Sequence, residues 1–110
     1  MSDESQISIP PSFIALFVPA GRTKPIASRQ EIAARYEVCE DLATALTDKA
    51  RTVQWELGVT EHDVLARIHQ GLCAPESAIG PAEALWVTRR LAELLAWDDF
   101  VLADIPDKAD

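Results

Sequence analysis

The strongest constraint on the fold is a run of apolar residues at heptad spacing, which we call the seam. Its members step by four and three residues in turn: Ile32, Tyr36, Cys39, Ala43, Leu46, Ala50, Val53 and Leu57. This spacing places them along one side of an α-helix, as in coiled coils. Burying each Leu or Ile side chain contributes about 1.5–3 kcal/mol, so other helices or a second chain should cover the seam.

Local signals set the bounds of this helix. Ser28 and Glu31 form a predicted capping box, in which each side chain accepts a hydrogen bond from the other residue's backbone amide. Gly58 follows the last seam residue and is the residue type that most readily adopts the left-handed conformation ending a helix. The pattern predicts a helix over about residues 29–57, which is about 43 Å long at 1.5 Å per residue.

Two shorter helices are predicted after Gly58. Thr60 and Asp63 form a second cap, and Gly71 is a natural terminator. After a loop, Pro81 opens a final helix that extends to about Trp97. Their apolar faces comprise Val64, Leu65, Ile68 and Leu72 in the first and Ala84, Val87, Leu91, Leu94 and Leu95 in the second.

The apolar stretch SFIALFV at residues 12–18 permits a strand or a short helix. Pro11 and Pro19 suit the two ends of a helix, and Phe13, Leu16 and Phe17 have helical spacing. No other segment reads as a strand that would pair with it, so we favour the helix.

The predicted fold is all-α: an irregular bundle of about four helices with one long central helix and flexible termini. We expect a single helical domain at residues 10–103. A flexible N-terminal segment at 1–9 and a flexible acidic tail at 104–110 flank it.

The charge balance and the N-terminal sequence limit the classes of partner. The net charge of −8 over 110 residues disfavours binding to nucleic acid or to an anionic membrane surface. No apolar run approaches the roughly 18 residues of a membrane span, and the first residues are acidic where a signal peptide is basic. We therefore expect a cytoplasmic protein in which Cys39 and Cys73 are reduced thiols.

The segment from Gly21 to Pro25 resembles a phosphate-binding loop only superficially. Such a loop needs two glycines, a lysine and a following Ser or Thr, whereas here Lys24 precedes Pro25. Arg22, Lys24 and Arg29 form the densest basic cluster of the chain. We interpret the segment as a solvated connector or as a contact for an anion or an acidic partner.

Other candidate chemistry is weak. His62 and His69 are seven residues apart, about 10 Å along a helix, which is too far to share one metal ion. Cys39 lies in the seam and should be buried, whereas Cys73 should be accessible but has no defined base beside it. Glu40 and Asp41 are interpreted as an acidic pair on a solvated face of the long helix. The sequence predicts no metal site, no cofactor and no catalytic constellation.

Four residues of the final helix share a second face: Trp86, Arg90, Glu93 and Trp97. Tryptophan beside charged residues is typical of interface hot spots, so this stripe is our candidate partner-binding surface; the alternative is that other segments cover the rings. The leading functional hypothesis is a non-enzymatic interaction or adaptor module with an unknown protein partner, and a homodimer is a further option. The alternative is a small enzyme or cofactor-binding subunit that uses Cys73, His69 and the basic loop 22–29.

Three segments, IPPSFIALFVPAGR, EIAARYEVCEDLA and ELGVTEHDVLARIHQGL, resemble a group of short uncharacterised betaproteobacterial proteins. The likeness covers about residues 8–72. Such proteins sometimes carry an automatic label of chaperone-type ATPase subunit. The resemblance implies a small bacterial cytosolic protein and supplies no catalytic residues to transfer.

Overall fold

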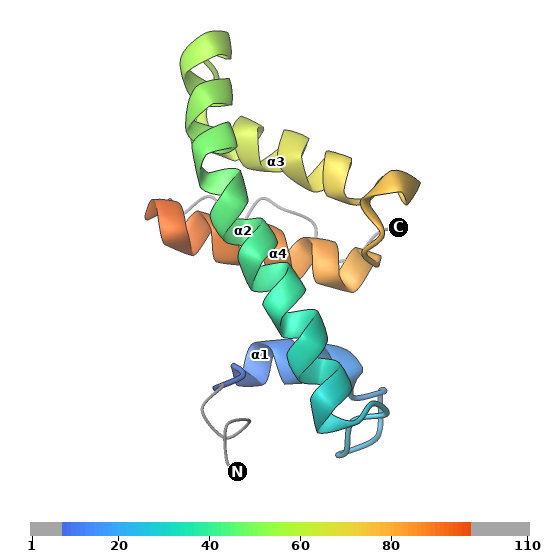
Figure 1. Ribbon diagram of the computed structural model, residues 1–110. Coiled ribbons are helices and arrows are strands. Elements are labelled where there is room, and N and C mark those ends of the chain that lie inside the picture. Colours follow the sequence, from blue (N-terminus) through green and yellow to red (C-terminus); the bar gives the residue numbers. More distant parts are fainter. Residues whose placement is uncertain (1–7, 98–110) are drawn as a thin grey trace. The chain divides into compact units, whose positions relative to one another are not determined.

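The computed structural model describes residues 8–97, and these residues contain four α-helices, two short 3₁₀ helices and no strand (Figure 1). The predicted all-α class with one long helix is confirmed. The expectations for residues 1–7 and for residues 98–110 lie outside the described part of the chain. The chain consists of two compact units, Met1–Val38 and Cys39–Asp110.

The first unit contains α1 (Pro11–Ile14) and the 3₁₀ helix η2 (Ala15–Phe17), so this apolar stretch is helical. Phe13 is fully buried between two aromatic rings. Its ring centroid lies 5.5 Å from that of Phe17 and 5.5 Å from that of Tyr36. Ile32 is also buried, at 3% exposure. The first turns of the long helix are therefore held against α1 by aromatic packing.

The long helix α2 spans Arg29–Leu57, as the sequence predicts. The Ser28 amide donates to Glu31 Oε1 at 2.8 Å, and the Glu31 amide donates to Ser28 Oγ at 3.1 Å, so the capping box is present. At the other end Gly58 has a φ of 63°, the left-handed conformation expected of the terminating residue.

In the second unit, α3 (Glu61–Leu72) and α4 (Pro81–Leu95) pack against each other. The Asp63 amide donates to Thr60 Oγ1 at 3.1 Å, which confirms the predicted cap of α3. The buried residues of α3 are the four predicted ones. Buried residues of α4 include Ala84, Val87, Leu91 and Leu95, together with Trp86, Thr88 and Ala92, which the pattern did not indicate.

The end of α4 differs from the prediction by two residues. The helix stops at Leu95 because Ala96 adopts the left-handed conformation, with a φ of 61°. This conformation is uncommon for alanine, which has a Cβ atom that crowds the following carbonyl group. No glycine marks the position, so the sequence gives no signal for it. Between the helices, the 3₁₀ helix η3 (Pro75–Ser77) interrupts the predicted loop.

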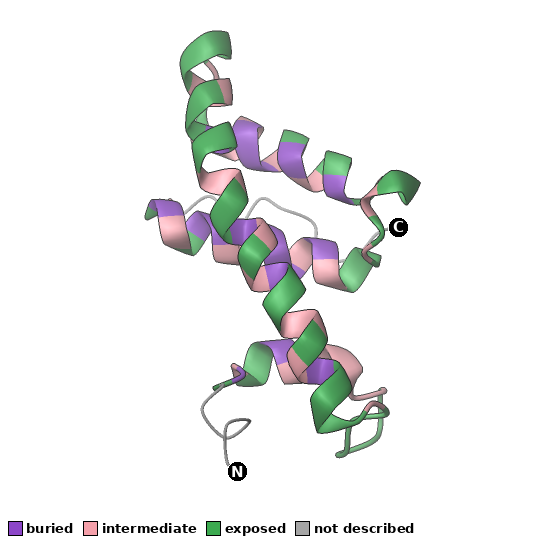
Figure 2. Ribbon diagram, in the orientation of Figure 1, coloured by how far each residue is buried: buried purple, intermediate pink, exposed green. Residues whose placement is uncertain are grey.

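Burial along the seam is uneven. Cys39, Ala43 and Ala50 are fully buried, whereas Leu46 and Val53 are half-buried and Leu57 is 53% exposed. Figure 2 shows the last turns of α2 largely exposed. The expectation that the whole seam is covered is therefore met in full only at Ile32, Cys39, Ala43 and Ala50, in part at Tyr36, Leu46 and Val53, and is wrong at Leu57.

Candidate functional site

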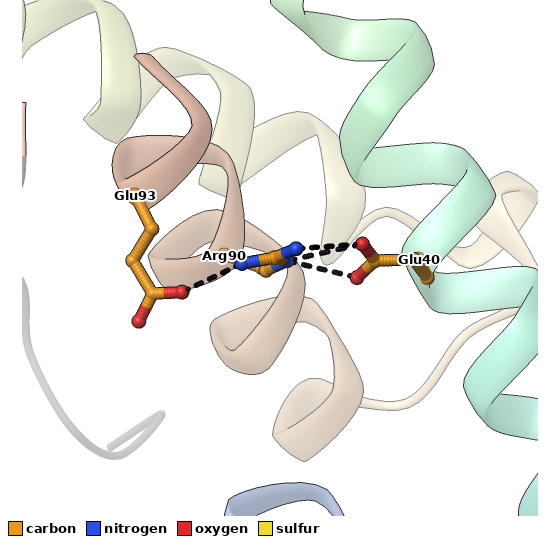
Figure 3. Close-up of polar contacts among 3 residues, drawn as sticks. All are labelled: Glu40, Arg90 and Glu93. Carbon is orange, nitrogen blue, oxygen red and sulfur yellow. Dashed lines mark hydrogen bonds and ion pairs between the residues drawn. The ribbon is translucent and has the colours of Figure 1, made fainter. Parts of the chain in front are cut away.

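The polar centre of the second unit is the guanidinium of Arg90, which lies between two carboxylates (Figure 3). Arg90 Nε donates to Glu40 Oε1 at 2.9 Å, and Nη2 donates to Glu40 Oε2 at 2.9 Å. Nη1 donates to Glu93 Oε1 at 3.1 Å. The pair with Glu40 joins α2 to α4 through a two-pronged contact that fixes orientation as well as distance.

This contact corrects the interpretation of Glu40 as part of a solvated face. The hydrogen bonds that Arg90 donates to Glu40 raise the pKa of Arg90, although burial opposes the shift. The guanidinium is therefore charged throughout the pH range in which proteins are folded. Arg90 and Glu93 serve this structural contact, whatever further role they have.

The predicted tryptophan stripe on α4 is divided between the core and the surface. Trp86 is 9% exposed, so its ring is not a free surface anchor, and Trp97 is half-buried. The helical spacing of the stripe is real, but burial depends on what packs against each ring. Of the two tryptophans in the predicted partner surface, only Trp97 is accessible enough to contact a partner.

Trp97 lies beside a residue that the stripe did not include. A shallow pocket of about 610 Å³, which we call the tryptophan pocket, is lined by Arg51, Gln54, Trp55, Gly58 and Trp97. Trp55 is 87% exposed, the most exposed large apolar side chain among the described residues. Its position off the seam was the one sequence signal for this, since a tryptophan outside the apolar face of a helix has nothing of its own helix to cover it.

A second hollow lies between the C-terminal turns of α2 and α3, and we call it the α2–α3 groove. Its volume is about 390 Å³, and its lining consists of Leu46, Lys49, Val53 and Leu57 from α2 with Arg67, Ile68, Gly71 and Leu72 from α3. The groove is thus the place where the seam is left uncovered. Lys49 is exposed on one wall, and on the other Arg67 is held by Asp63 at 2.8 Å.

Cys73 and His69 lie together at the end of α3. Cys73 Sγ is 3.6 Å from His69 Nε2, and the thiol is exposed as predicted. Burial lowers the pKa of His69. The structure thus supplies the basic group that the sequence left undefined beside Cys73. Cys39, in contrast, is buried as predicted.

The basic cluster belongs to the first unit. Arg22, Lys24 and Arg29 are all exposed. Arg29 also lines a pocket of about 270 Å³ with five apolar neighbours, namely Ile9, Ile14, Pro25, Ala27 and Ile32. The burial of Ile9 places part of the predicted N-terminal segment in this core. An anion or acidic partner at the cluster stays a prediction.

Within residues 8–97, no group of three or more His, Cys, Asp or Glu side chains has the arrangement needed to hold a metal ion. No helix in the same range has both the length and the apolar character required to cross a membrane. No protein-family model matches the chain, and neither a curated protein nor a solved structure matches it.

Proposed function

We propose that this chain is a non-enzymatic, cytoplasmic protein–protein interaction module that binds its partner at the tryptophan pocket. The observation that carries the proposal is the 87% exposure of Trp55 beside Trp97 in one pocket. Leaving an indole ring in water forgoes a large burial energy, and tryptophan is strongly enriched among interface hot spots. A partner side chain placed against the two rings recovers that energy.

The pocket lining favours an apolar anchor with polar surroundings. Trp55 and Trp97 offer flat apolar faces, whereas Arg51 and Gln54 offer donors for backbone carbonyl groups of a partner segment. Gly58 has no side chain to obstruct the approach. The net charge of −8 attracts a basic partner over longer distances and speeds its association. The partner class is therefore a basic protein that inserts an apolar side chain.

The resemblance to short betaproteobacterial proteins is compatible with this role. It adds a bacterial origin to the proposal, and a chaperone-associated adaptor is one form that the role would take. An adaptor needs exposed anchors rather than a reactive centre, and Trp55 meets that requirement.

The test is affinity purification with Trp55→Ala and Trp97→Ala, followed by calorimetry with the purified partner. Ile26→Ala is the matched control, because Ile26 is 72% exposed but belongs to the other unit. A hot-spot contribution of about 2 kcal/mol weakens binding about 30-fold in the Trp55 variant and leaves the control unchanged. Equal affinity for wild type and the Trp55 variant contradicts the proposal.

A second candidate function rests on the 3.6 Å contact between Cys73 Sγ and His69 Nε2. A base beside an exposed thiol supports nucleophilic or redox chemistry in a small enzyme. The position is unfavourable in one respect, because the carbonyl ends of α3 repel anions there. Iodoacetamide alkylation of Cys73 between pH 5 and 9, compared with His69→Gln, tests it. Equal rate profiles in the two proteins exclude assistance by His69.

A further inference from the structure

The α2–α3 groove is an open apolar hollow whose two walls are helices. Three seam residues face it, Leu46, Val53 and Leu57, and the opposite wall is formed by Ile68 and Leu72. At Gly71, the position of an added Cβ atom meets nothing within 4 Å, so the groove is open there. Heptad spacing is typical of helices that pack along one another, and of the seam residues in this stretch only Ala50 is fully buried within its own chain. The occupant should therefore be a helix with the same spacing.

Charges beside the seam restrict which helix fits. One edge carries Lys49 and, seven residues on, Glu56, and both are exposed. The corresponding positions on the other edge are Thr47 and Gln54, which carry no charge. On the α3 wall, Arg67 is already paired with Asp63 at 2.8 Å. Lys49 and Glu56 are therefore the main charged residues of α2 with which a helix in the groove could form ion pairs.

If the α2 helix of a second copy runs antiparallel to the first, Lys49 of each chain can form an ion pair with Glu56 of the other. A two-fold axis near Val53 brings Lys49 within one helical turn of Glu56 of the partner subunit, and it does so twice. Leu46 then lies against Leu57 of the partner subunit. In a parallel pair, Lys49 would instead lie opposite Gln54, so the charges select the antiparallel arrangement.

We propose that the α2–α3 groove is a homodimer interface in which the C-terminal halves of two α2 helices pair antiparallel, with reciprocal Lys49–Glu56 ion pairs. The interface is isologous and closed, since each copy gives and receives the same contacts. It buries Leu57, which is 53% exposed in a single chain. The tryptophan pocket is lined by other residues, so this inference does not rest on the proposed function.

Charge reversal tests the arrangement by sedimentation velocity and mass photometry. In Lys49→Glu, two glutamates face each other at both contacts, and in Glu56→Lys two lysines do. We expect each variant to dissociate at a concentration about tenfold or more above that of wild type. An equimolar mixture of the two variants restores opposite charges at both contacts, so it should form heterodimers with near wild-type affinity.

Three controls separate the interface from general effects. Lys24→Glu makes the same charge change at an exposed residue of the other unit and should leave the dimer intact. Leu57→Asp places a carboxylate in the apolar groove and should give a monomer with unchanged circular dichroism. Trp55→Ala should leave the dimer unchanged, which keeps this test separate from that of the tryptophan pocket.

Three outcomes overturn the inference. A wild-type protein that stays monomeric at several hundred micromolar has no such interface. A dimer that survives Leu57→Asp uses another surface. If Leu57→Asp abolishes the dimer but Lys49→Glu and Glu56→Lys both dimerise like wild type, the helices do not pair in the antiparallel arrangement. Recovery of the dimer in the mixture alone, with each variant monomeric by itself, supports it.

Discussion

The two halves of the seam on α2 follow one heptad pattern but have different surroundings. Ile32, Cys39 and Ala43 are at most 3% exposed, whereas Leu57 is 53% exposed. Near the covered positions, Tyr36 packs against the ring of Phe13 in one unit, and Glu40 binds Arg90 of α4 in the other. The uncovered ones border the α2–α3 groove. Periodicity therefore determines that a helix forms and which side is apolar, but not how far along the helix its neighbours extend.

The largest expected effect contrasts the two ends of the seam. Ile32→Ala removes a buried side chain and should lower the free energy of unfolding by about 2–4 kcal/mol. Leu57→Ala, at protein concentrations low enough for a monomer, should change it by less than about 0.5 kcal/mol. Urea unfolding followed by circular dichroism measures both. Similar losses at the two positions would contradict the contrast.

A smaller effect concerns how tightly the covered residues of the seam are packed. Ala43 is fully buried, and Ala45, two residues later, is exposed. Ala43→Leu should cost about 1–3 kcal/mol because the added carbon atoms have no space in the packed core. Ala45→Leu is the matched control on the same helix and should be nearly neutral. Thermal unfolding monitored by circular dichroism gives the comparison, and a tolerant Ala43 would show that this part of the seam is loosely packed.

Next in size is the ion pair that joins the covered part of α2 to α4. A double-mutant cycle with Glu40→Gln and Arg90→Met should give a coupling energy of about 1 kcal/mol, as expected for a two-pronged pair whose side chains are 33% and 24% exposed. The cycle between Arg90 and Glu93, which are neighbours on one helix, should give about 0.3 kcal/mol. A coupling to Glu40 no larger than that to Glu93 would mean that the contact does not hold α2.

The smallest effect is a pH dependence on α3, beside the uncovered half. Burial lowers the pKa of His69 below its ordinary value of 6.5, so the unfolded chain binds this proton more tightly than the folded chain. The stabilisation is complete above pH 6.5 and declines as the pH falls toward the folded-state pKa. Melting temperatures at pH 7.5 and 5.5 should differ less in His69→Gln than in wild type. An equal difference in the two proteins would assign the pH dependence to other groups.

The helix bounds were predictable because their signals are local. Ser28, Glu31 and Gly58 set the ends of α2 through neighbours within a few residues, and Thr60 sets the start of α3. The predicted terminator Gly71 instead lies within α3, which ends at Leu72. The end of α4 was not predictable, because Ala96 adopts a left-handed conformation. In a sequence, glycine or asparagine is the usual sign of that conformation at a helix end.

The interaction surfaces were only partly predictable, because burial and pairing depend on residues distant in sequence. Arg90 is 50 residues from Glu40, and no pattern in either helix indicates that they meet. Trp86 and Trp97 share a helical face but differ in burial, and Trp55 joins Trp97 in one pocket only in the folded chain. A sequence identifies such candidates, whereas the tertiary arrangement determines which of them face solvent.

Thiol labelling tests the central contrast most directly. One variant, Cys73→Ser, reports on Cys39, and a second, Leu57→Cys with Cys39→Ala and Cys73→Ser, reports on the other end of the seam. At nanomolar concentration, position 57 should react at least about 100-fold faster than Cys39, whose reaction requires an opening of the packed core. The rate at position 57 should fall as the protein concentration rises and the groove is filled by a second copy. Equal rates at the two positions at nanomolar concentration would show that the seam is not covered at one end and open at the other.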